Sequence, residues 1–369
     1  MAAAALLGAV YTLVAPSLTA RFLAKAAARM APAPAVTLIK PLHHEPAGLA
    51  QALESFCVQD YRGPVQILFG VADADDPAAD VVRALQARRP DLDIGLIIEP
   101  RSHGVNRKVS NLINIAAAAR HDILVVSDAD IRVPPDYLSV VVAALERPGV
   151  GAVTCFYSGD GVAGIWSTLS AMAINYHFLP NAILGKTIGM ADPCFGSTIA
   201  LTRDTLRAVG GFESVADKLA DDFELGARVR RLGLTIATPP MAVTHDCTDA
   251  SLAGLVDHEI RWGRTVRIID PMGYVGSLIT NPLPLAVIAS ALLGFSPASL
   301  GLIFTILLLR IALKFRIDGA TGERAGPWWL LPARDVLSFF VFLASFTGAT
   351  VDWQGRRFRG ERDGALSHT

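Results

Sequence analysis

The sequence predicts an α/β domain built on a mostly parallel sheet, with membrane-associated segments at both ends of the chain. Short apolar runs alternate with stretches of helical length from Val36 onward, which is typical of a parallel sheet covered by helices on both faces. Carboxylates follow two of these runs, at the strand ends where open α/β sheets place ligands. The apolar excess lies at the ends of the chain, because residues 1–20 and 275–309 carry no charged side chain.

Local patterns define the individual elements of this domain. Short apolar runs predict strands at Val36–Lys40, Val65–Val71, Ile94–Ile98, Ile123–Ser127, Gly151–Tyr157 and Ser197–Leu201. Longer stretches predict helices at Gly48–Cys57, Ala78–Arg89, Asn106–Arg120, a segment ending near Glu146, Asp221–Leu232 and Ser251–Ile268. The apolar stretch 162–184 is interrupted by Asn175 and His177. Three interpretations of it stay open: a core helix, an interfacial helix at the membrane surface, or a wall for a lipid acceptor. The spacing of its Trp and Tyr residues favours the interfacial helix.

Composition excludes several classes of protein. Of the 369 residues, 52% are apolar and 18% are charged, too apolar for an ordinary soluble enzyme and too charged in the middle for a pure transporter. The net charge of −1 leaves no basic footprint for nucleic acid. The cysteines are scattered without metal-ligand spacing, which favours a reduced, cytosol-facing domain: Cys57, Cys155, Cys194 and Cys247.

Residues 1–22 predict an N-terminal membrane anchor. The segment lacks the basic start of a signal peptide, and its cations, Arg21, Lys25 and Arg29, follow the apolar run instead. Because cytoplasmic flanks carry an excess of cations, this arrangement predicts that the domain that follows, residues 34–270, lies in the cytoplasm.

Residues 274–355 predict C-terminal membrane segments, and residues 356–369 a basic tail. We expect two helices around Gly294-Phe295-Ser296-Pro297, returning to the cytoplasm at Arg310, Lys314 and Arg316. The last apolar run, Val336–Val351, has sixteen residues and covers about 24 Å as a helix, less than the roughly 30 Å of a bilayer core. It is therefore expected to re-enter or lie at the interface, leaving the cations of the tail on the cytoplasmic side: Arg356, Arg357, Arg359 and Arg362.

The triplet Asp128-Ala129-Asp130 follows the buried run Ile123–Ser127. Two carboxylates at that position can reach a divalent cation that carries phosphate oxygens, since Mg²⁺ takes few protein carboxylates together with substrate phosphates. Aspartate is also common in ordinary turns at strand ends, so the triplet alone is a weak signal.

Further motifs make the interpretation specific. The chain carries Ile39-Lys40-Pro41-Leu42, Asp75-Asp76-Pro77, Asn106-Arg107-Lys108-Val109-Ser110-Asn111-Leu112, Asp130-Ile131-Arg132-Val133, Pro193-Cys194-Phe195-Gly196-Ser197-Thr198, Ala220-Asp221-Asp222, His258-x-x-Arg261-Trp262 and Trp353-x-Gly355-Arg356-Arg357-Phe358-Arg359. In this order they resemble the inverting, lipid-modifying glycosyltransferases with the Rossmann-like GT-A fold, and more narrowly the ceramide glucosyltransferase family. The cysteine and aspartate motifs are most similar to its bacterial branch in hopanoid synthesis. The resemblance covers roughly Val36 to Arg362.

That resemblance implies a role for each motif. Asp222 becomes the general base that activates the acceptor alcohol, with helix capping as the structural alternative. Asp130 and Asp128 would hold Mg²⁺ or Mn²⁺ against the diphosphate of a UDP-sugar. The donor site would comprise Lys40, Lys108 at the phosphates, Arg261 with its fixed donors, and Asp75 at the nucleoside, where Asp73 and Asp76 are alternatives.

The acceptor side is implied in the same way. Trp262 would offer a flat apolar face, His258 replaces the Gln or Arg that usually begins the motif, and the remaining substrate contacts would come from Gly196, Ser197 and His177. A histidine such as His177 is more often structural than catalytic. Arg261-Trp262 also suits an interfacial membrane anchor.

The resemblance implies an integral protein of the bacterial inner membrane that moves N-acetylglucosamine from UDP-GlcNAc to the hopanoid polyol bacteriohopanetetrol. Transfer of glucose to ceramide is the alternative within the family. A processive polysaccharide synthase is disfavoured by the short C-terminal membrane region. A membrane protein that binds nucleotide sugars without catalysis is the alternative from another class, and the intact set of acidic motifs speaks against it.

Overall fold

The computed structural model describes residues 2–27, 33–44, 46–348, 350–353, 356–360 and 366–368, and side chains within the first three of these ranges. The chain divides into two compact units, which we describe separately. The sheet unit comprises Ala26–Tyr157 and Asp192–Asp246. The helical unit comprises Met1–Lys25, Ser158–Ala191 and Cys247–Thr369.

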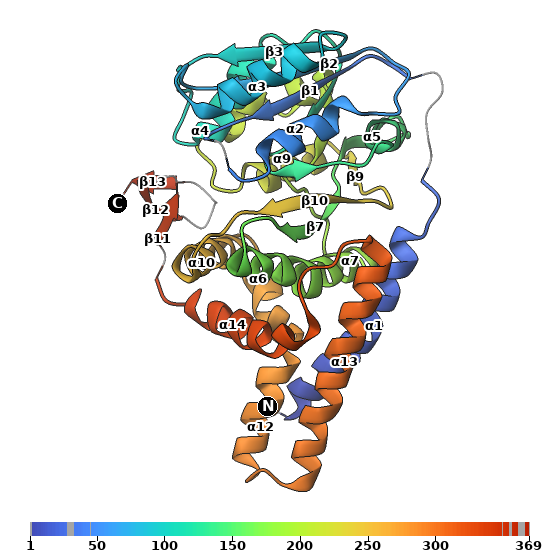
Figure 1. Ribbon diagram of the computed structural model, residues 1–369, viewed down its shortest axis with the longest axis vertical. Coiled ribbons are helices and arrows are strands. Elements are labelled where there is room, and N and C mark those ends of the chain that lie inside the picture. The colour runs from blue at the N-terminus through green and yellow to red at the C-terminus, as the bar shows by residue number, and fades with distance from the viewer. Residues whose placement is uncertain are drawn as a thin grey trace. The chain divides into compact units, whose positions relative to one another are not determined.

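A seven-stranded sheet forms the centre of the sheet unit, with strand order β3-β2-β1-β4-β8-β6-β9 (Figure 1). The first four strands in that order are parallel: β3 (Asp93–Ile98), β2 (Val65–Val71), β1 (Val36–Pro41) and β4 (Ile123–Val126). Strand β8 (Ile199–Thr202) is antiparallel to both neighbours, β4 and β6 (Val150–Val153), and β9 (Thr235–Ala237) is parallel to β6. The sheet is mostly parallel, as predicted.

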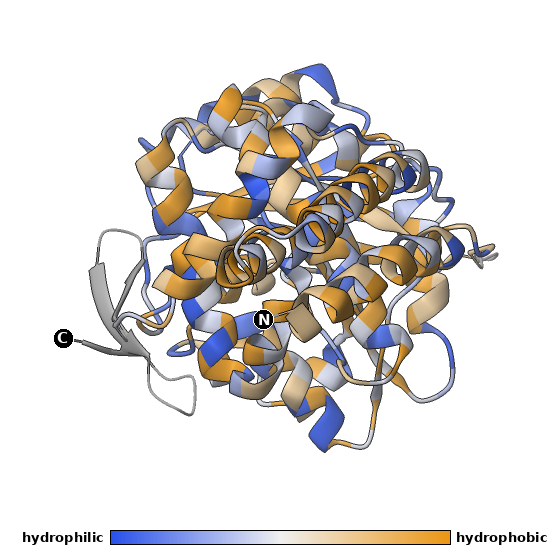
Figure 2. Cartoon of the chain, turned by 90° about the horizontal axis from the view of Figure 1, so that it is seen from below, coloured by the Kyte–Doolittle hydropathy of each residue, from blue (hydrophilic) through white to orange (hydrophobic). Residues whose placement is uncertain are grey.

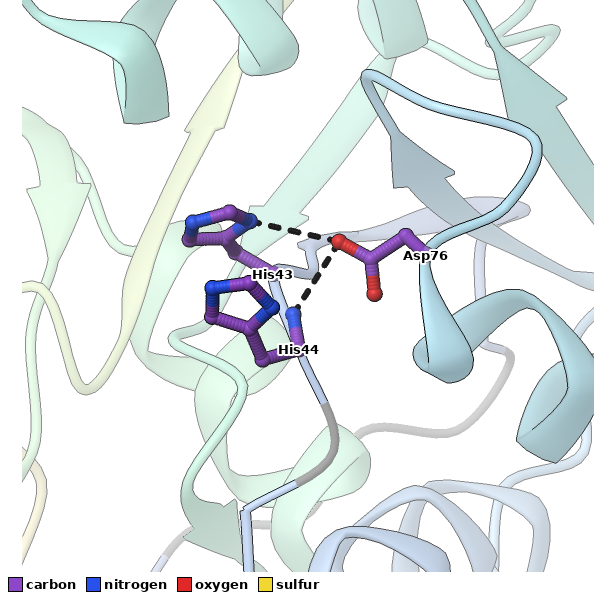
Figure 3. A group of neighbouring side chains, drawn as sticks. All are labelled: His43, His44 and Asp76. Atoms are coloured by element: carbon purple, nitrogen blue, oxygen red, sulfur yellow. Dashed lines mark hydrogen bonds and ion pairs between the residues drawn. The ribbon is translucent and has the colours of Figure 1, made fainter.

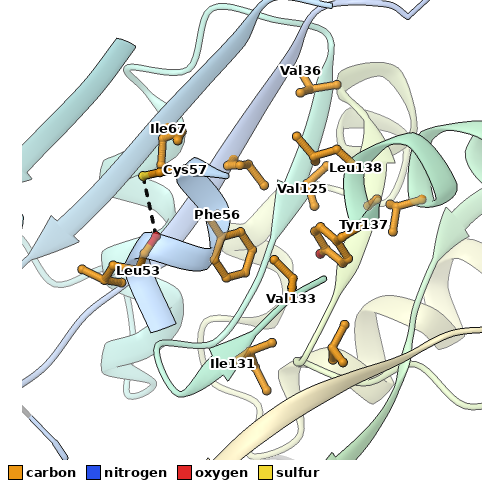
Figure 4. Close-up of a cluster of buried hydrophobic side chains, with 14 of the residues drawn as sticks. Val36, Leu53, Phe56, Cys57, Ile67, Val125, Ile131, Val133, Tyr137 and Leu138 are labelled. Carbon is orange, nitrogen blue, oxygen red and sulfur yellow. Dashed lines mark hydrogen bonds between the residues drawn. The ribbon is translucent and has the colours of Figure 1, made fainter. Parts of the chain in front are cut away.

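Helices cover both faces of this sheet, because its strands are apolar on both sides. Along β4, Val125 packs into one core cluster and Leu124 into another, as the alternation of side chains in a strand requires. The first cluster, shown in Figure 4, contains α2 (Leu49–Cys57), α3 (Pro77–Arg88) and α5 (Tyr137–Leu145). The second contains α4 (Arg107–Ala116), α8 (Arg203–Ala208), the 3₁₀ turn η2 (Phe212–Val215) and α9 (Asp221–Arg231).

Two of the predicted elements differ from the structure. The helix expected over Asn106–Arg120 ends at Ala116. The strand expected over Gly151–Tyr157 is two strands, β6 and β7 (Phe156–Gly161), because Thr154 breaks the run: its hydroxyl bonds to the backbone of Phe195. Strand β7 does not belong to the large sheet. It belongs to a small sheet of order β5-β10-β7. There β5 (Ile131–Arg132) pairs antiparallel with β10 (Ala242–Cys247), so that His245 lies opposite Ile131.

The helical unit contains two helices long and apolar enough to cross a membrane, α1 (Ala2–Leu23) and α13 (Pro297–Thr321). The stretch Pro271–Thr280, comprising α11 (Pro271–Gly276) and the 3₁₀ turn η3 (Ser277–Thr280), and α12 (Pro282–Leu292) form a further candidate, bent by 70°. Large apolar side chains stay exposed on α1 and α13, among them Leu6, Leu7, Val10, Leu13, Phe304 and Leu308. Seen from below, hydrophobic residues are frequent in the helices near the N-terminus (Figure 2). The turn between α12 and α13 falls at Gly294 and Phe295, both with positive φ.

The stretch 162–184 is not one regular helix. It forms α6 (Ile165–Ala173), the π-helical turn η1 (Ile174–Phe178) and α7 (Leu179–Thr187). Asn175 bonds to the backbone of Gly159, and Tyr176 donates to Asp318 on α13. The burial of Tyr176 and of other apolar side chains in this stretch favours the core-helix interpretation: Leu169, Met172, Leu179 and Ile183.

Buried ion pairs hold the helical unit together. The Arg310 guanidinium lies 2.6 Å from Asp335 on α14 (Leu331–Ala344), and the Lys314 ammonium lies 2.6 Å from Asp318. The side chains of Arg310 and Lys314 are 1% and 4% exposed, so both cations are paired inside the protein. The return to the cytoplasm expected at Arg310, Lys314 and Arg316 stays a prediction. A third pair joins Arg334 on α14 to Glu259 on α10 (Leu252–Ile269) at 2.7 Å.

The end of the chain forms a small antiparallel sheet of β11 (Thr350–Trp353), β12 (Arg356–Gly360) and β13 (Leu366–His368). Of the motif Trp353-x-Gly355-Arg356-Arg357-Phe358-Arg359, Gly355 lies outside the described residues, as do Arg29 and Arg362.

Candidate active site

The ends of β1, β2 and β4 bring the predicted donor-site residues to one edge of the sheet. These strands are parallel neighbours, so the loops after Pro41, Val71 and Val126 all leave the sheet at its carboxyl edge. Asp75 follows β2 and Asp128 follows β4. This edge is where open α/β sheets bind ligands.

Asp128 pairs with Lys108 of the predicted phosphate-binding motif. Nζ of Lys108 lies 2.7 Å from Oδ1 of Asp128 and 3.4 Å from Oδ2 of Asp221. Burial lowers the pKa of Lys108, but the charges of Asp128 and Asp221 outweigh it and raise the pKa above its usual range. Burial raises the pKa of Asp128, against the opposing effect of Lys108. The Lys108 ammonium therefore lies between two carboxylates, one from the loop after β4 and one from α9.

Asp130 faces a different partner. Its Oδ2 lies 3.3 Å from Nε2 of His245, and burial, which raises the pKa of Asp130, is outweighed by His245, so that the pKa falls to about 2. Oδ1 of Asp130 is buried without a hydrogen-bond partner among the described residues. A buried acceptor in that state is a suitable ligand for a cation, so this part of the site fits a divalent metal ion.

His245 is a site residue that sequence reasoning missed. It lies on β10, a strand with the polar sequence Thr244-His245-Asp246, so no apolar run marked the element. Its antiparallel pairing with β5 brings the imidazole next to Asp130.

Lys40 supports the Asp128-Ala129-Asp130 turn. Its side chain is fully buried, and Nζ donates to the backbone oxygens of Asp128 at 2.7 Å and Ile131 at 3.3 Å. The ammonium also lies 3.8 Å from the ring centre of Phe56, a cation–π contact. Burial lowers the pKa of Lys40 to about 7, although Asp130 and Asp128 oppose this. The geometry places Lys40 beneath the turn, whereas its predicted contact with the donor stays a prediction.

Asp222 stands at the start of α9, close to this cluster. Its Oδ2 accepts a hydrogen bond of 2.9 Å from the backbone N–H of Gly196, and its Oδ1 accepts one of 2.7 Å from Phe223. Burial and the neighbouring Asp221 raise the pKa of Asp222 to about 6, although Lys108 lowers it. A carboxylate with a pKa near 6 is a competent general base at neutral pH.

Gly196 is required by close packing rather than by its backbone angles. A Cβ at this position would lie 2.6 Å from Oδ2 of Asp128 and 2.9 Å from Nζ of Lys108. The neighbouring Ser197 is buried, and its hydroxyl donates to the carbonyl of Cys155. Gly196 therefore joins Asp222 to the Asp128–Lys108 pair.

The acidic loop after β2 divides its carboxylates between roles. Asp76 caps α3, since its Oδ1 accepts from the N–H of Ala78 at 3.0 Å. Asp73 accepts from the N–H of Asp75, whose own side chain is exposed. Asp73 and Asp75 are both exposed, so these two stay open as the donor contact, whereas Asp76 is engaged at the start of α3.

The remaining predicted site residues belong to the helical unit. On α10, His258 lies 3.2 Å from Asp249, and its ring contacts the edge of Trp262 at 4.3 Å between centres. Burial lowers the pKa of Arg261, with Asp249 opposing. His177 bonds to Asp335 at 3.0 Å and to Arg310 at 2.9 Å, within the buried ion-pair network. Thus His258 and Trp262 are brought together, and His177 is held elsewhere in the same unit.

The chain is similar to known glycosyltransferases over most of its length. A family model described as Glycosyl transferase family 21 matches residues 1–366. Ceramide glucosyltransferase 1 of Caenorhabditis elegans is 22% identical over 341 residues, which cover 88% of this chain and 72% of that protein. An N-acetylglucosaminyltransferase of Bradyrhizobium diazoefficiens is 25% identical over 244 residues, or 63% of this chain and 49% of that one.

One solved structure is similar over almost the whole chain. The mannosyltransferase PcManGT of Pyrobaculum calidifontis, in complex with GDP-Man and Mn²⁺, matches with a TM-score of 0.51 and 21% identity, covering 94% of this chain and 98% of the other. At this level of identity the match describes the fold.

Proposed function

The chain belongs to glycosyl transferase family 21 and has the GT-A fold, and on that premise we propose that it transfers N-acetylglucosamine from UDP-GlcNAc to a hopanoid polyol at a bacterial membrane. The chain is a glycosyltransferase by family. The observation that carries the proposed chemistry is the cluster of Asp222, Gly196, Asp128 and Lys108 at the carboxyl edge of the sheet.

In this proposal Asp222 removes the proton from the attacking hydroxyl. Its raised pKa lets the carboxylate accept a proton near neutral pH. The N–H of Gly196 and that of Phe223 fix its orientation. Direct attack by the alcohol on the face opposite the diphosphate inverts the anomeric carbon, so no protein nucleophile is needed.

Charge on the leaving diphosphate is balanced by cations around Asp128 and Asp130. Lys108 contributes a fixed positive charge beside Asp128. Arg261 is proposed as a further donor to the diphosphate from its motif alone. Mg²⁺ or Mn²⁺ held by Asp130 and Asp128 would act as a Lewis acid on the diphosphate. The similar mannosyltransferase binds GDP-Man and Mn²⁺, which supports a divalent ion and a nucleotide sugar here.

Transfer of glucose to ceramide is the second candidate function. Two ceramide glucosyltransferases of Caenorhabditis elegans match over 88% of the chain, whereas the bacterial N-acetylglucosaminyltransferase matches over 63%. The two functions differ in the 2-substituent of the donor sugar and in the lipid acceptor. A nucleotide-sugar-binding protein without catalysis would form no lipid product with either donor.

The deciding experiment incubates the detergent-purified full chain with UDP-GlcNAc or UDP-glucose, each against bacteriohopanetetrol and ceramide, and identifies lipid products by mass. The proposal expects an N-acetylhexosamine adduct of the hopanoid, whose formation is slower by roughly 10²-fold or more with Asp222→Asn. A hexose adduct of ceramide as the main product would replace it with the second candidate. UDP binding without any lipid product would support the non-catalytic alternative.

The proposed orientation keeps the catalytic domain and the basic tail in the cytoplasm. Helix α14 covers about 21 Å, shorter than a bilayer core, and its Arg334 and Asp335 are buried in ion pairs. These facts support a segment that does not cross the membrane. A Ser367→Cys variant tests it, because labelling by an impermeant maleimide in intact cells would place the tail outside and contradict the proposal.

A further inference from the structure

His43, His44 and Asp76 gather at the carboxyl edge of the sheet unit, apart from the carboxylates of the proposed reaction. The two histidines follow β1, and Asp76 precedes α3 (Figure 3). Each of the three offers one ligand atom, and these atoms all lie within 4.8 Å of one another. The proposed transfer uses none of these three side chains.

The distances suit one shared ion. Nδ1 of His43 lies 3.2 Å from Oδ2 of Asp76. Two ligands about 2.0–2.1 Å from a tetrahedral Zn²⁺ are about 3.3 Å apart, so this pair already has the spacing of one tetrahedral edge. The imidazole rings stack with centres 3.9 Å apart and planes inclined by 29°, which places the His44 ring alongside that of His43.

Backbone groups orient the carboxylate before any ion arrives. Oδ2 of Asp76 accepts from the N–H of His44 at 3.1 Å, and Oδ1 accepts from the N–H of Ala78 at 3.0 Å. These two bonds fix the positions of both carboxylate oxygens of Asp76. Hydrogen bonds that fix a ligand in this way are typical of metal sites.

His44 also has an unusual backbone conformation. Its φ is +61°, a region that residues with a side chain seldom adopt. Its N–H bond to Asp76 holds that conformation and brings both rings to the same side of the carboxylate (Figure 3). Strain of this kind concentrates at functional sites.

We propose that His43, His44 and Asp76 form a site for a transition-metal ion of the zinc class, separate from the Mg²⁺ or Mn²⁺ of the transfer reaction. Two imidazoles and one carboxylate suit Zn²⁺ and its neighbours, whereas Mg²⁺ prefers oxygen ligands alone. Both histidines are exposed, so water completes the coordination. The bound ion ties the loop after β1 to the start of α3, beside the exposed Asp75.

The test measures Zn²⁺ binding to the detergent-purified full chain by calorimetry, with excess Mg²⁺ present to occupy the oxygen-rich site. We expect one Zn²⁺ equivalent in the wild type, weakened at least about tenfold in His43→Gln and in His44→Gln, since loss even of a supporting group costs that much. His103→Gln is the matched control, because that ring instead bonds to Asn114 at 2.7 Å. Substitution at exposed histidines leaves the α3 cap in place, so the variants are expected to fold.

Zn²⁺ can also bind near Asp130 and His245, so Asp130→Ala is measured in parallel. This variant is expected to bind one Zn²⁺ ion as the wild type does. Co²⁺ gives a second readout, as visible absorption of a tetrahedral ion in the wild type that is lost in the double variant His43→Gln/His44→Gln. Absence of Zn²⁺ binding in the wild type overturns the proposal, and so does Zn²⁺ binding in both histidine variants that is as tight as in the wild type. Loss of the equivalent only in Asp130→Ala does so too. Because the readout is binding, the result does not depend on whether the proposed transfer reaction is correct.

Discussion

The backbone N–H of Gly196 donates a 2.9 Å hydrogen bond to Oδ2 of Asp222. A Cβ on Gly196 would collide with Asp128 and Lys108 on its other side. One residue without a side chain therefore connects the proposed base to the groups proposed to face the diphosphate. A backbone bond also links Gly196 to this side, because the N–H of Asp128 donates to the carbonyl of Gly196 at 3.2 Å.

Replacing the proposed base tests its role directly. Asp222→Asn keeps the shape of the side chain and removes its proton affinity, so turnover should fall by roughly 10²-fold or more while UDP binding survives. Steady-state rates and UDP calorimetry measure the two effects. Turnover near that of the wild type would leave Asp222 as the helix-capping residue of the alternative interpretation.

The pH profile should carry the signature of the same carboxylate. A base must be deprotonated to act, so with a pKa of about 6 activity should rise with pH up to that value and level off above it. Asp221→Asn removes a neighbouring negative charge that raises this pKa, so the acidic limb should move to lower pH. A profile that is flat between pH 5 and 7 (roughly one unit either side of that value), or a limb unmoved in Asp221→Asn, would contradict the assignment.

Asp130→Ala should separate metal binding from folding. The side chain is 37% exposed and bonds to one histidine, so its loss should change the unfolding temperature little while abolishing metal-dependent UDP binding. Asp204→Ala, at a carboxylate 89% exposed and outside the site, is the control. A large fall in unfolding temperature with UDP affinity intact would make Asp130 a structural residue.

Lys40→Met should weaken metal binding without removing a ligand. Methionine fills a similar volume but cannot bond to the backbone oxygens of Asp128 and Ile131, so the turn loses its support. We expect metal affinity to fall about 10–100-fold, with turnover recovered at saturating metal. Lys25→Met, at an exposed lysine, is the control. If metal affinity is unchanged but UDP affinity falls, Lys40 contacts the donor, as the sequence predicts.

The Arg334–Glu259 pair offers a test of stability inside the helical unit. Glu259→Gln leaves the buried guanidinium without its counter-charge and should cost about 3–5 kcal/mol of unfolding free energy. The double variant Arg334→Met/Glu259→Leu should recover most of that loss, because it removes both charges. Thermal unfolding in detergent measures the unfolding free energy of the wild type and of each variant in this double-mutant cycle. Additive losses in the double variant would show that the two residues act independently.

The sequence predicted the strands whose signal is local. Val65–Val71 has the predicted bounds because its apolar run is bounded by turn residues. The strand β10 was missed because Thr244-His245-Asp246 is polar, and His245 was missed with it. The ion pairs of Arg310 and Lys314 escaped prediction for another reason. The same cations are expected at a membrane boundary, and the partner of Arg310 lies 25 residues away on another helix.

The same distinction between local and long-range signals applies to the candidate site. Asp128, Lys108 and Asp222 could be predicted because the resemblance fixes them by motif, and the structure places them in one unit. The support that Lys40 gives to the turn could not be predicted, because it depends on a hydrogen bond to the backbone oxygen of Asp128, 88 residues away. Motifs identify residue types, whereas the tertiary fold decides which atoms they meet.

The π-helical turn Ile174–Phe178 makes the chain sensitive to length at that point. Asn175, Tyr176 and His177 contact three different segments, through Gly159, Asp318 and Asp335. Removing one residue would turn everything after it by about 100° around the helix axis. A substitution in this turn alters one contact at a time, whereas an insertion or deletion just before Asn175 misaligns all three partners at once.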